Sequence, residues 1–297
     1  MAVFLLGVGA ACLLGLGFVL QQHAAQKAPL SDFLSLRLLL DLARMPQWLI
    51  GMACVIGGQV LGAIALSMGS VSAVEPLTAT NLLFAMALSR WLTRQPLGRT
   101  GWAGVCLLAL GVTSFIIGGQ PTEGSGPAGP LRHWLVFGVV VGLAILLAAF
   151  ARRLPLCEEA TVLALAAGLL YGLQDAMTRV SGELFTQGGL GRLVVGWQLY
   201  AVLALGVAGL VLVQSAFETA PLRMSLPALT AAQPLAGIAC GVGFLGDRLR
   251  VTPGALALEA AGLVCIVAGI VVIGRHPAMP TGGSGEHDRV LESTAPR

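Results

Sequence analysis

Charged residues are scarce in this chain. Only 10% of its 297 residues are Asp, Glu, Lys or Arg, whereas a soluble domain of this size carries about 25%. Hydrophobic residues make up 56%, so the chain lacks the polar surface that would cover a water-soluble core. Lipid is therefore its expected solvent. The net charge of +3 comes without a basic cluster, and we expect no nucleic-acid partner.

The motifs of common enzyme classes are also absent. The sequence contains no Walker A, GxSxG or HExxH pattern, so nothing indicates an ATPase, a hydrolase or a metalloprotease. Its six cysteines show no CxxC or Cys/His spacing, which leaves a disulfide framework and a zinc site without support. We therefore expect no enzymatic activity and no cofactor. The first apolar run lacks a basic segment before it and is predicted to be a retained helix.

Long apolar runs dominate what is present. A helix needs about 20 apolar residues to cross the hydrocarbon, and nine runs meet or approach this length: 2–22, 47–69, 72–93, 99–118, 132–150, 159–181, 192–213, 222–245 and 253–274. A tenth candidate, Leu30–Met45, is shorter and carries Asp32, Arg37, Asp41 and Arg44. It either spans the membrane or lies at the interface. The sequence thus predicts an all-α polytopic membrane protein with nine or ten transmembrane helices.

The segment Leu77–Leu97 is repeated 152 residues later as Leu229–Leu249. Leu77-Thr78-Ala79 matches Leu229-Thr230-Ala231, and Asn81 matches Gln233. If Leu30–Met45 spans, the helices form a five-plus-five repeat in which 132–150 corresponds to 2–22 and 192–213 to 47–69. The two copies of the repeated helix are five crossings apart and hence antiparallel, which predicts the inverted repeat typical of secondary transporters.

Composition divides the chain into four parts. We expect a first transmembrane repeat at 1–118, a flexible Gly/Pro-rich linker at 119–131, a second repeat at 132–275 and a disordered tail at 276–297. Arginines gather in the connections on one side, which predicts a cytoplasmic C-terminus in a cell membrane. The N-terminus is on the same side if Leu30–Met45 spans and on the opposite side if it does not.

The residues Gly246-Asp247-Arg248-Leu249 resemble the Gly-Glu-Arg-Leu helix ending of the drug/metabolite transporter superfamily, the EamA-like permeases. The corresponding residues of the first copy, Arg94-Gln95-Pro96-Leu97, depart from it. The chain resembles in particular the NIPA-like group associated with magnesium transport. The resemblance implies a ten-helix inverted-repeat carrier of small solutes in a plasma membrane, with Mg²⁺ as one candidate cargo.

Polar residues inside apolar helices are costly and typically face a cavity or a partner helix. The repeat superposes Thr78 on Thr230 and Asn81 on Gln233, and we interpret these four as the candidate substrate-binding residues. Gln59 and Gln198 are further candidate lining groups. The alternative is that the hydroxyls bond their own helix and the amides join neighbouring helices.

Two carboxylates are candidates for ion coupling or cation binding. Glu75 precedes Pro76 and alternatively caps its helix. Asp175 lies four residues before Arg179 and alternatively forms a structural ion pair with it. Burial disfavours the charged form of a carboxyl group and so brings its protonation toward neutral pH, which makes Asp175 the candidate for proton coupling. Metal ligands stay unknown.

The sequence favours a secondary transporter that moves a small solute or metabolite by alternating access, with proton coupling as an option. A NIPA-like carrier of Mg²⁺ is the alternative, and a non-transporting membrane scaffold is the alternative of another class. The expected partners are the solute or ion and membrane lipid. A homodimer stays open.

Overall fold

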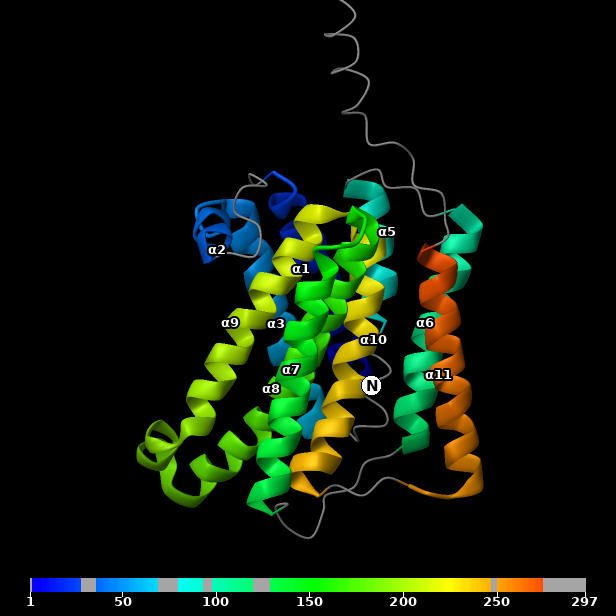
Figure 1. Cartoon of the computed structure of the whole chain (residues 1–297). Helices are drawn as coiled ribbons and strands as arrows, with labels where there is room; N and C mark the ends of the chain where they lie inside the picture. Colours follow the sequence, from blue (N-terminus) through cyan, green and yellow to red (C-terminus); the bar gives the residue numbers. More distant parts are fainter. Residues whose placement is uncertain are drawn as a thin grey trace, which may run out of the picture.

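The computed structural model describes residues 2–27, 36–68, 80–92, 98–119, 129–246 and 250–274. All regular structure in these ranges is helical, and the helices stand side by side in one bundle (Figure 1). The elements are α1 (Ala2–Ala25), α2 (Leu36–Leu42), α3 (Pro46–Met68), α5 (Asn81–Leu92), α6 (Gly98–Gly119), α7 (Pro130–Ala151), α8 (Leu156–Val195), α9 (Trp197–Thr219), α10 (Leu222–Cys240), η2 (Gly241–Leu245) and α11 (Pro253–Gly274). Within the described ranges, seven helices are long and apolar enough to cross a membrane. The chain is a multi-pass membrane protein.

Local residues explain where several helices begin and end. α3, α7 and α11 each begin at a proline. The fixed φ of proline suits a first helical position, where the N–H that proline lacks would have no partner within the helix. α10 runs into the π-helical turn η2 and stops at Gly246, which has a left-handed φ of 68°. A side chain there would be strained. The glycine of the expected Gly-Asp-Arg-Leu ending thus terminates the helix.

The boundary between α8 and α9 differs from the prediction. We expected helices at 159–181 and 192–213, but helical structure continues past 181 to a break at Gly188 and Gly189. α9 starts only after Gly196, whose extended backbone separates it from α8. Residues 182–187 contain no proline, and their polarity alone does not end the helix. The glycines do, since Gly189 takes a φ of 63°.

The tenth candidate span is not supported. Its described helix, α2, has seven residues and is about 10 Å long, far short of the hydrocarbon thickness. The Lys27 ammonium at the end of α1 donates to the Gln47 side chain at the start of α3, at 3.2 Å. α1 therefore ends and α3 begins at the same end of the bundle, which we call the α2 end. Asp41 and Arg44 form an exposed ion pair there at 3.0 Å.

The linker and tail predictions fall mostly outside the described residues. Of the predicted linker, 120–128 is not described, while Gly119 ends α6 and Pro130 begins α7. The predicted tail, 276–297, is likewise outside the described residues.

Glycines set the close approach of α6 to α11. Gly104, Gly111 and Gly118 lie seven residues apart on α6, and they face Gly269, Gly262 and Ala255 on α11 in reverse order. The two helices are therefore antiparallel, with backbone against backbone over three successive layers. A Cβ at Gly111 would lie 2.8 Å from the carbonyl oxygen of Gly262. Small residues permit this kind of contact in membranes.

The second half of the bundle is centred on α8, which packs against α7, α9 and α10. α8 and α10 are parallel, because Gly168 faces Leu229 and Ala232 while Gly172 faces Ala236 and Gly237. α8 and α9 run in opposite directions. In the first half, α1 packs on α3 and α5.

Candidate polar site within the membrane

The central polar contact joins α8 to α10. The Gln233 side-chain amide donates a hydrogen bond to the Asp175 carboxylate at 3.0 Å. Two residues predicted from sequence, one as a binding group and one as a coupling group, thus come together in one site. Gln233 lies eleven residues after Leu222, the start of α10, which is about 17 Å along a hydrocarbon layer of about 30 Å. The contact is therefore near the middle of the expected membrane.

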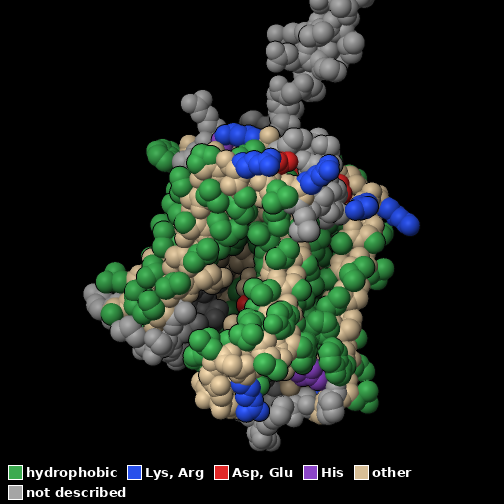
Figure 2. All heavy atoms as spheres, turned by 90° about the vertical axis from the view of Figure 1, so that its left-hand side faces the viewer, with side chains coloured by type: hydrophobic (Ala, Val, Ile, Leu, Met, Phe, Trp, Pro, Cys, Tyr) green, Lys and Arg blue, Asp and Glu red, His purple; other side chains and the backbone are tan. Residues whose placement is uncertain are grey.

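The Asp175 side chain is accessible although it lies well inside a spanning helix. Figure 2 shows a hollow at mid height of one face, with an acidic side chain inside it. A carboxylate exposed to hydrocarbon at this depth would be costly. The arrangement is suited to a polar, hydrated recess.

Two further residues of α8 belong to this site. The Tyr171 ring lies over Gly209 of α9, and the Gln174 amide lies over Gly206. A Cβ at Gly209 would be 2.6 Å from the ring and one at Gly206 would be 3.0 Å from the amide nitrogen. Tyr171 is also close enough to Asp175 for an electrostatic interaction. The signal that could have revealed them is a shared spacing, since both pairs lie three residues apart on their helices.

Pro234 removes one backbone hydrogen bond from α10. Pro234 has no N–H, so the carbonyl of Thr230 receives no helical hydrogen bond from it. Thr230 is half-buried, one turn before Gln233. The site therefore combines a carboxylate, two amides and a phenol, and it lies one turn from the Thr230 carbonyl.

The α2 end of the bundle is closed by contacts between the halves. The side-chain amide of Gln214 on α9 donates a hydrogen bond to the side-chain oxygen Oε1 of Gln21 on α1 at 2.7 Å, and both side chains are buried. The rings of Phe18 and Phe217 meet edge to face beside them, with centroids 6.3 Å apart. Next to this pair, Gln22 is completely buried, and both its amide atoms lack a hydrogen-bond partner among the described residues.

The other predicted site residues are placed as follows. Glu75 and Thr78 lie outside the described residues. Asn81 is half-buried at the start of α5, where its carbonyl Oδ1 has no described partner. Gln59 is exposed on α3, and Gln198 is half-buried at the start of α9, in the turn around Gly196. No described contact joins these three to Asp175.

No metal cluster is formed by the described ranges, because they contain no group of three or more His, Cys, Asp or Glu side chains. Asp175, Glu218 and Glu259 lie on α8, α9 and α11, respectively. The described carboxylates therefore do not converge on one point. Glu75 is not among them.

Two curated proteins are similar to this chain. An uncharacterised protein of Corynebacterium glutamicum is 27% identical over 285 residues, which cover 94% of this chain and 96% of that protein. A probable magnesium transporter, NIPA9 of Arabidopsis thaliana, is 23% identical over 256 residues, or 82% of this chain and 73% of that protein. No family model matches the sequence. No solved structure matches it either.

Proposed function

We propose that the protein is a secondary transporter that moves a small polar solute through the recess at Asp175. The observation that carries this proposal is the Asp175–Gln233 contact, an accessible carboxylate bonded across two spanning helices near mid-membrane. Ionisable groups at this depth mark substrate or ion pathways. A carboxylate with amide and phenol neighbours suits a neutral or zwitterionic organic solute, and Asp175 exchanges the coupling proton.

The contrast between the accessible site at Asp175 and the closed α2 end supports alternating access. The Asp175 side chain near mid-membrane is accessible, whereas contacts among Gln21, Gln214, Phe18 and Phe217 close the α2 end. A carrier must open these contacts to release solute on that side. The buried, unpartnered amide of Gln22 favours such opening, because water entering the gap would hydrate it.

We also infer that the halves are inverted repeats in a register different from the five-plus-five assignment. The shift of 152 residues that matches Leu77 to Leu229 places α1 on 154–177, which overlaps the first part of α8. Packing supports this register, since α1 contacts α3 and α5 as α8 contacts α9 and α10. α6 and α11 are antiparallel, as an inversion requires. α7 is then the helix without a counterpart.

Basic residues support the orientation. The described cations near the α2 end are Lys27, Arg37, Arg44, Arg99, Arg152, Arg153 and Arg223, and those toward the other end are Arg132, Arg179, Arg192 and Arg250. Figure 2 shows most of the Lys and Arg side chains on this face at one end. We propose that the α2 end and the C-terminus are cytoplasmic in a cell membrane.

Transport of Mg²⁺ is the second candidate function. It is favoured by the similarity to the probable magnesium transporter of Arabidopsis thaliana. Mg²⁺ is bound through one or two carboxylates while it keeps several waters. Asp175, in an accessible recess, would then be the ligand on the pathway.

Flux measurements in proteoliposomes test both functions. One set receives a pooled metabolite extract under a pH gradient, with uptake followed by mass spectrometry, and the other receives Mg²⁺ with an enclosed indicator. We expect gradient-dependent solute uptake by the parent, and uptake at the level of empty vesicles for Asp175→Asn. Glu183→Gln is the matched control, because Glu183 is an exposed carboxylate two turns further along the same helix.

The possible outcomes distinguish an organic-solute carrier, a Mg²⁺ carrier and a non-transporting scaffold. Uptake that persists in Asp175→Asn contradicts the role of this carboxylate. Mg²⁺ flux that is lost in Asp175→Asn and kept in Glu183→Gln replaces the organic solute by the cation. Absence of flux in both sets for a correctly inserted parent would leave the non-transporting scaffold.

A further inference from the structure

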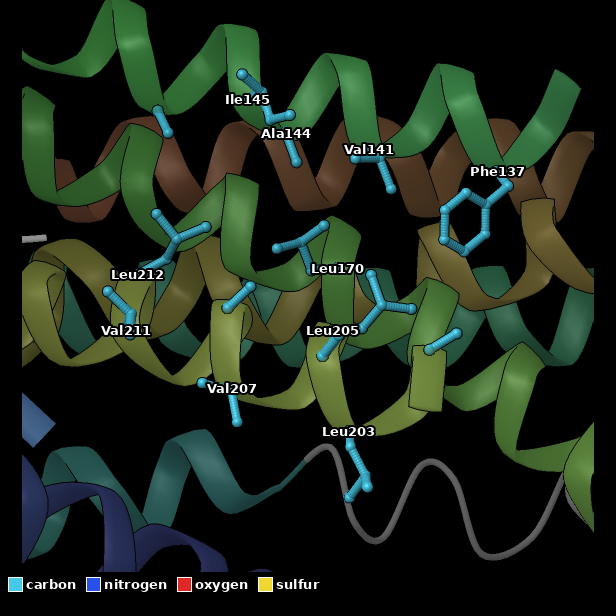
Figure 3. Close-up of a pocket in the computed structure, with 14 residues that line it drawn as sticks. Phe137, Val141, Ala144, Ile145, Leu170, Leu203, Leu205, Val207, Val211 and Leu212 are labelled. Carbon is cyan, nitrogen blue, oxygen red and sulfur yellow. The ribbon is translucent and has the colours of Figure 1, made fainter. Parts of the chain in front are cut away.

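An apolar groove runs between α7 and α9 on the outside of the bundle. Its volume is about 840 Å³, and all of its lining side chains are apolar. Both helices pack against α8, which contributes Leu170 to the groove. Alanines open the space on both walls: Ala144 and Ala148 on α7, and Ala201, Ala204 and Ala208 on α9. Figure 3 shows the lining residues from Phe137 at one end to Val211 and Leu212 at the other.

The groove is about as long as one extended acyl chain. Phe137 and Ala148 are its first and last residues on α7, and eleven helical steps of about 1.5 Å separate them by about 17 Å. Half of the hydrocarbon layer is about 15 Å. A spanning helix of a second copy would need a groove of about 30 Å. The groove is thus long enough for an acyl chain and about half as long as a spanning helix requires.

The Phe137 end leads into a cluster of aromatic rings. Trp134 of α7 and Trp197 of α9 stack with centroids 4.9 Å apart, and the Phe137 ring lies 6.0 Å from Trp197. His133 contacts Trp197 and Phe244 edge to face. Tryptophan rings are enriched at the level of lipid headgroups. The groove therefore opens at the membrane interface.

Positive charge accompanies this cluster. Each stacked tryptophan is closely preceded in the chain by an exposed arginine, Arg132 before Trp134 and Arg192 before Trp197. Arg132 donates to the Val242 carbonyl of η2 at 2.9 Å. A guanidinium has five N–H donors, so this bond leaves others for a phosphate. α7 and α9 also both begin here, with the positive ends of their helix dipoles.

We propose that the α7–α9 groove is a lipid-binding site, with one acyl chain of a phospholipid along the alanine walls and its phosphate near Arg132, Trp134 and Trp197. The length of the groove favours a single acyl chain over a helix of a second copy of the protein. The positive charge beside the aromatic cluster favours a headgroup that carries a phosphate. The site requires only that the chain spans a membrane, and it is separate from the polar recess at Asp175.

Native mass spectrometry of the full chain, released from nanodiscs of mixed phosphatidylglycerol and phosphatidylcholine, tests the site. We expect one retained phosphatidylglycerol on the parent. Ala208→Phe fills the groove and should abolish retention, whereas Ala149→Phe, on an exposed position of α7 that does not line the groove, should keep it. Arg132→Gln should weaken retention about fivefold. Arg153→Gln, at the other end of α7, should not.

Equal retention by Ala208→Phe and Ala149→Phe would overturn the groove as the binding site. Retention that does not change in Arg132→Gln or in a combined Arg132→Gln/Arg192→Gln variant would overturn the headgroup assignment. A parent dimer that Ala208→Phe converts to a monomer would identify a second copy as the occupant instead. Thermal unfolding of each variant confirms that it is folded, and Ala204→Phe provides an independent block of the same groove.

Discussion

Replacement of Gly111 by Ala tests the close packing of α6 on α11. The new Cβ would lie 2.7 Å from the backbone nitrogen of Ile266 and 2.8 Å from the carbonyl oxygen of Gly262. Both are backbone atoms, so no side-chain rotation relieves the clash. The helices must separate, and the layers at Gly104 and Gly118 lose contact with them.

The magnitude follows from two opposing effects. Over-packing a tight contact costs about 1–3 kcal/mol, while Ala stabilises a helix relative to Gly by about 1 kcal/mol. Gly142→Ala on α7 measures the second effect alone, because a Cβ there meets nothing within 4 Å. The difference between the two variants isolates packing. At about 2–4 °C per kcal/mol, the Tm of Gly111→Ala should lie about 2–12 °C below that of Gly142→Ala.

The assay is thermal unfolding of the purified full chain in one detergent, followed by intrinsic tryptophan fluorescence. Gly142→Ala should equal or exceed the parent. If both variants unfold at the same temperature, backbone contact between α6 and α11 is wrong.

The remaining predictions concern buried polar contacts. Thr161→Val removes the hydroxyl that lies 3.0 Å from the carbonyl oxygen of Met224 on α10. The free energy of unfolding should fall by about 0.6 kcal/mol and the Tm by about 1–2 °C. An unchanged Tm would show that this hydrogen bond is not formed in the membrane protein. Gln214→Leu leaves the buried Gln21 oxygen without its donor and should cost about 1–3 kcal/mol. The double variant with Gln21→Leu should regain much of this stability, and equal losses in the single and double variants would contradict the hydrogen bond.

Most of the helices could be predicted because a spanning helix is specified by its own residues. Twenty apolar residues must satisfy their backbone within the helix wherever they lie in the bilayer, and the observed bounds of α1, α6, α7 and α11 follow the apolar runs closely. The sequence left open whether Leu30–Met45 spans, because the placement of an apolar segment of intermediate length depends on where its neighbours begin and end. The glycine spacing of seven on α6 and α11 was present in the sequence but overlooked.

The candidate site was only partly predictable. Gln233 and Asp175 were each selected because they are polar in apolar helices, yet they were assigned separate roles. Their contact depends on the parallel packing of α8 and α10 through Gly168 and Gly172. Tyr171 was missed because its three-residue spacing from Gln174 gains meaning only when α9, with Gly206 and Gly209 at the same spacing, is known to face it.

The sequence by itself determined the solvent of this protein and the positions of most of its helices, because burial in lipid depends on composition over a short stretch. It also identified the two polar side chains that meet at mid-membrane. Only the tertiary structure decided that they meet, that the α2 end is closed while the recess is open, and that α7 and α9 leave an apolar groove one leaflet long. These properties depend on contacts between residues far apart in the chain, and in a membrane such contacts are set by the shapes of helix surfaces, which local hydropathy does not encode.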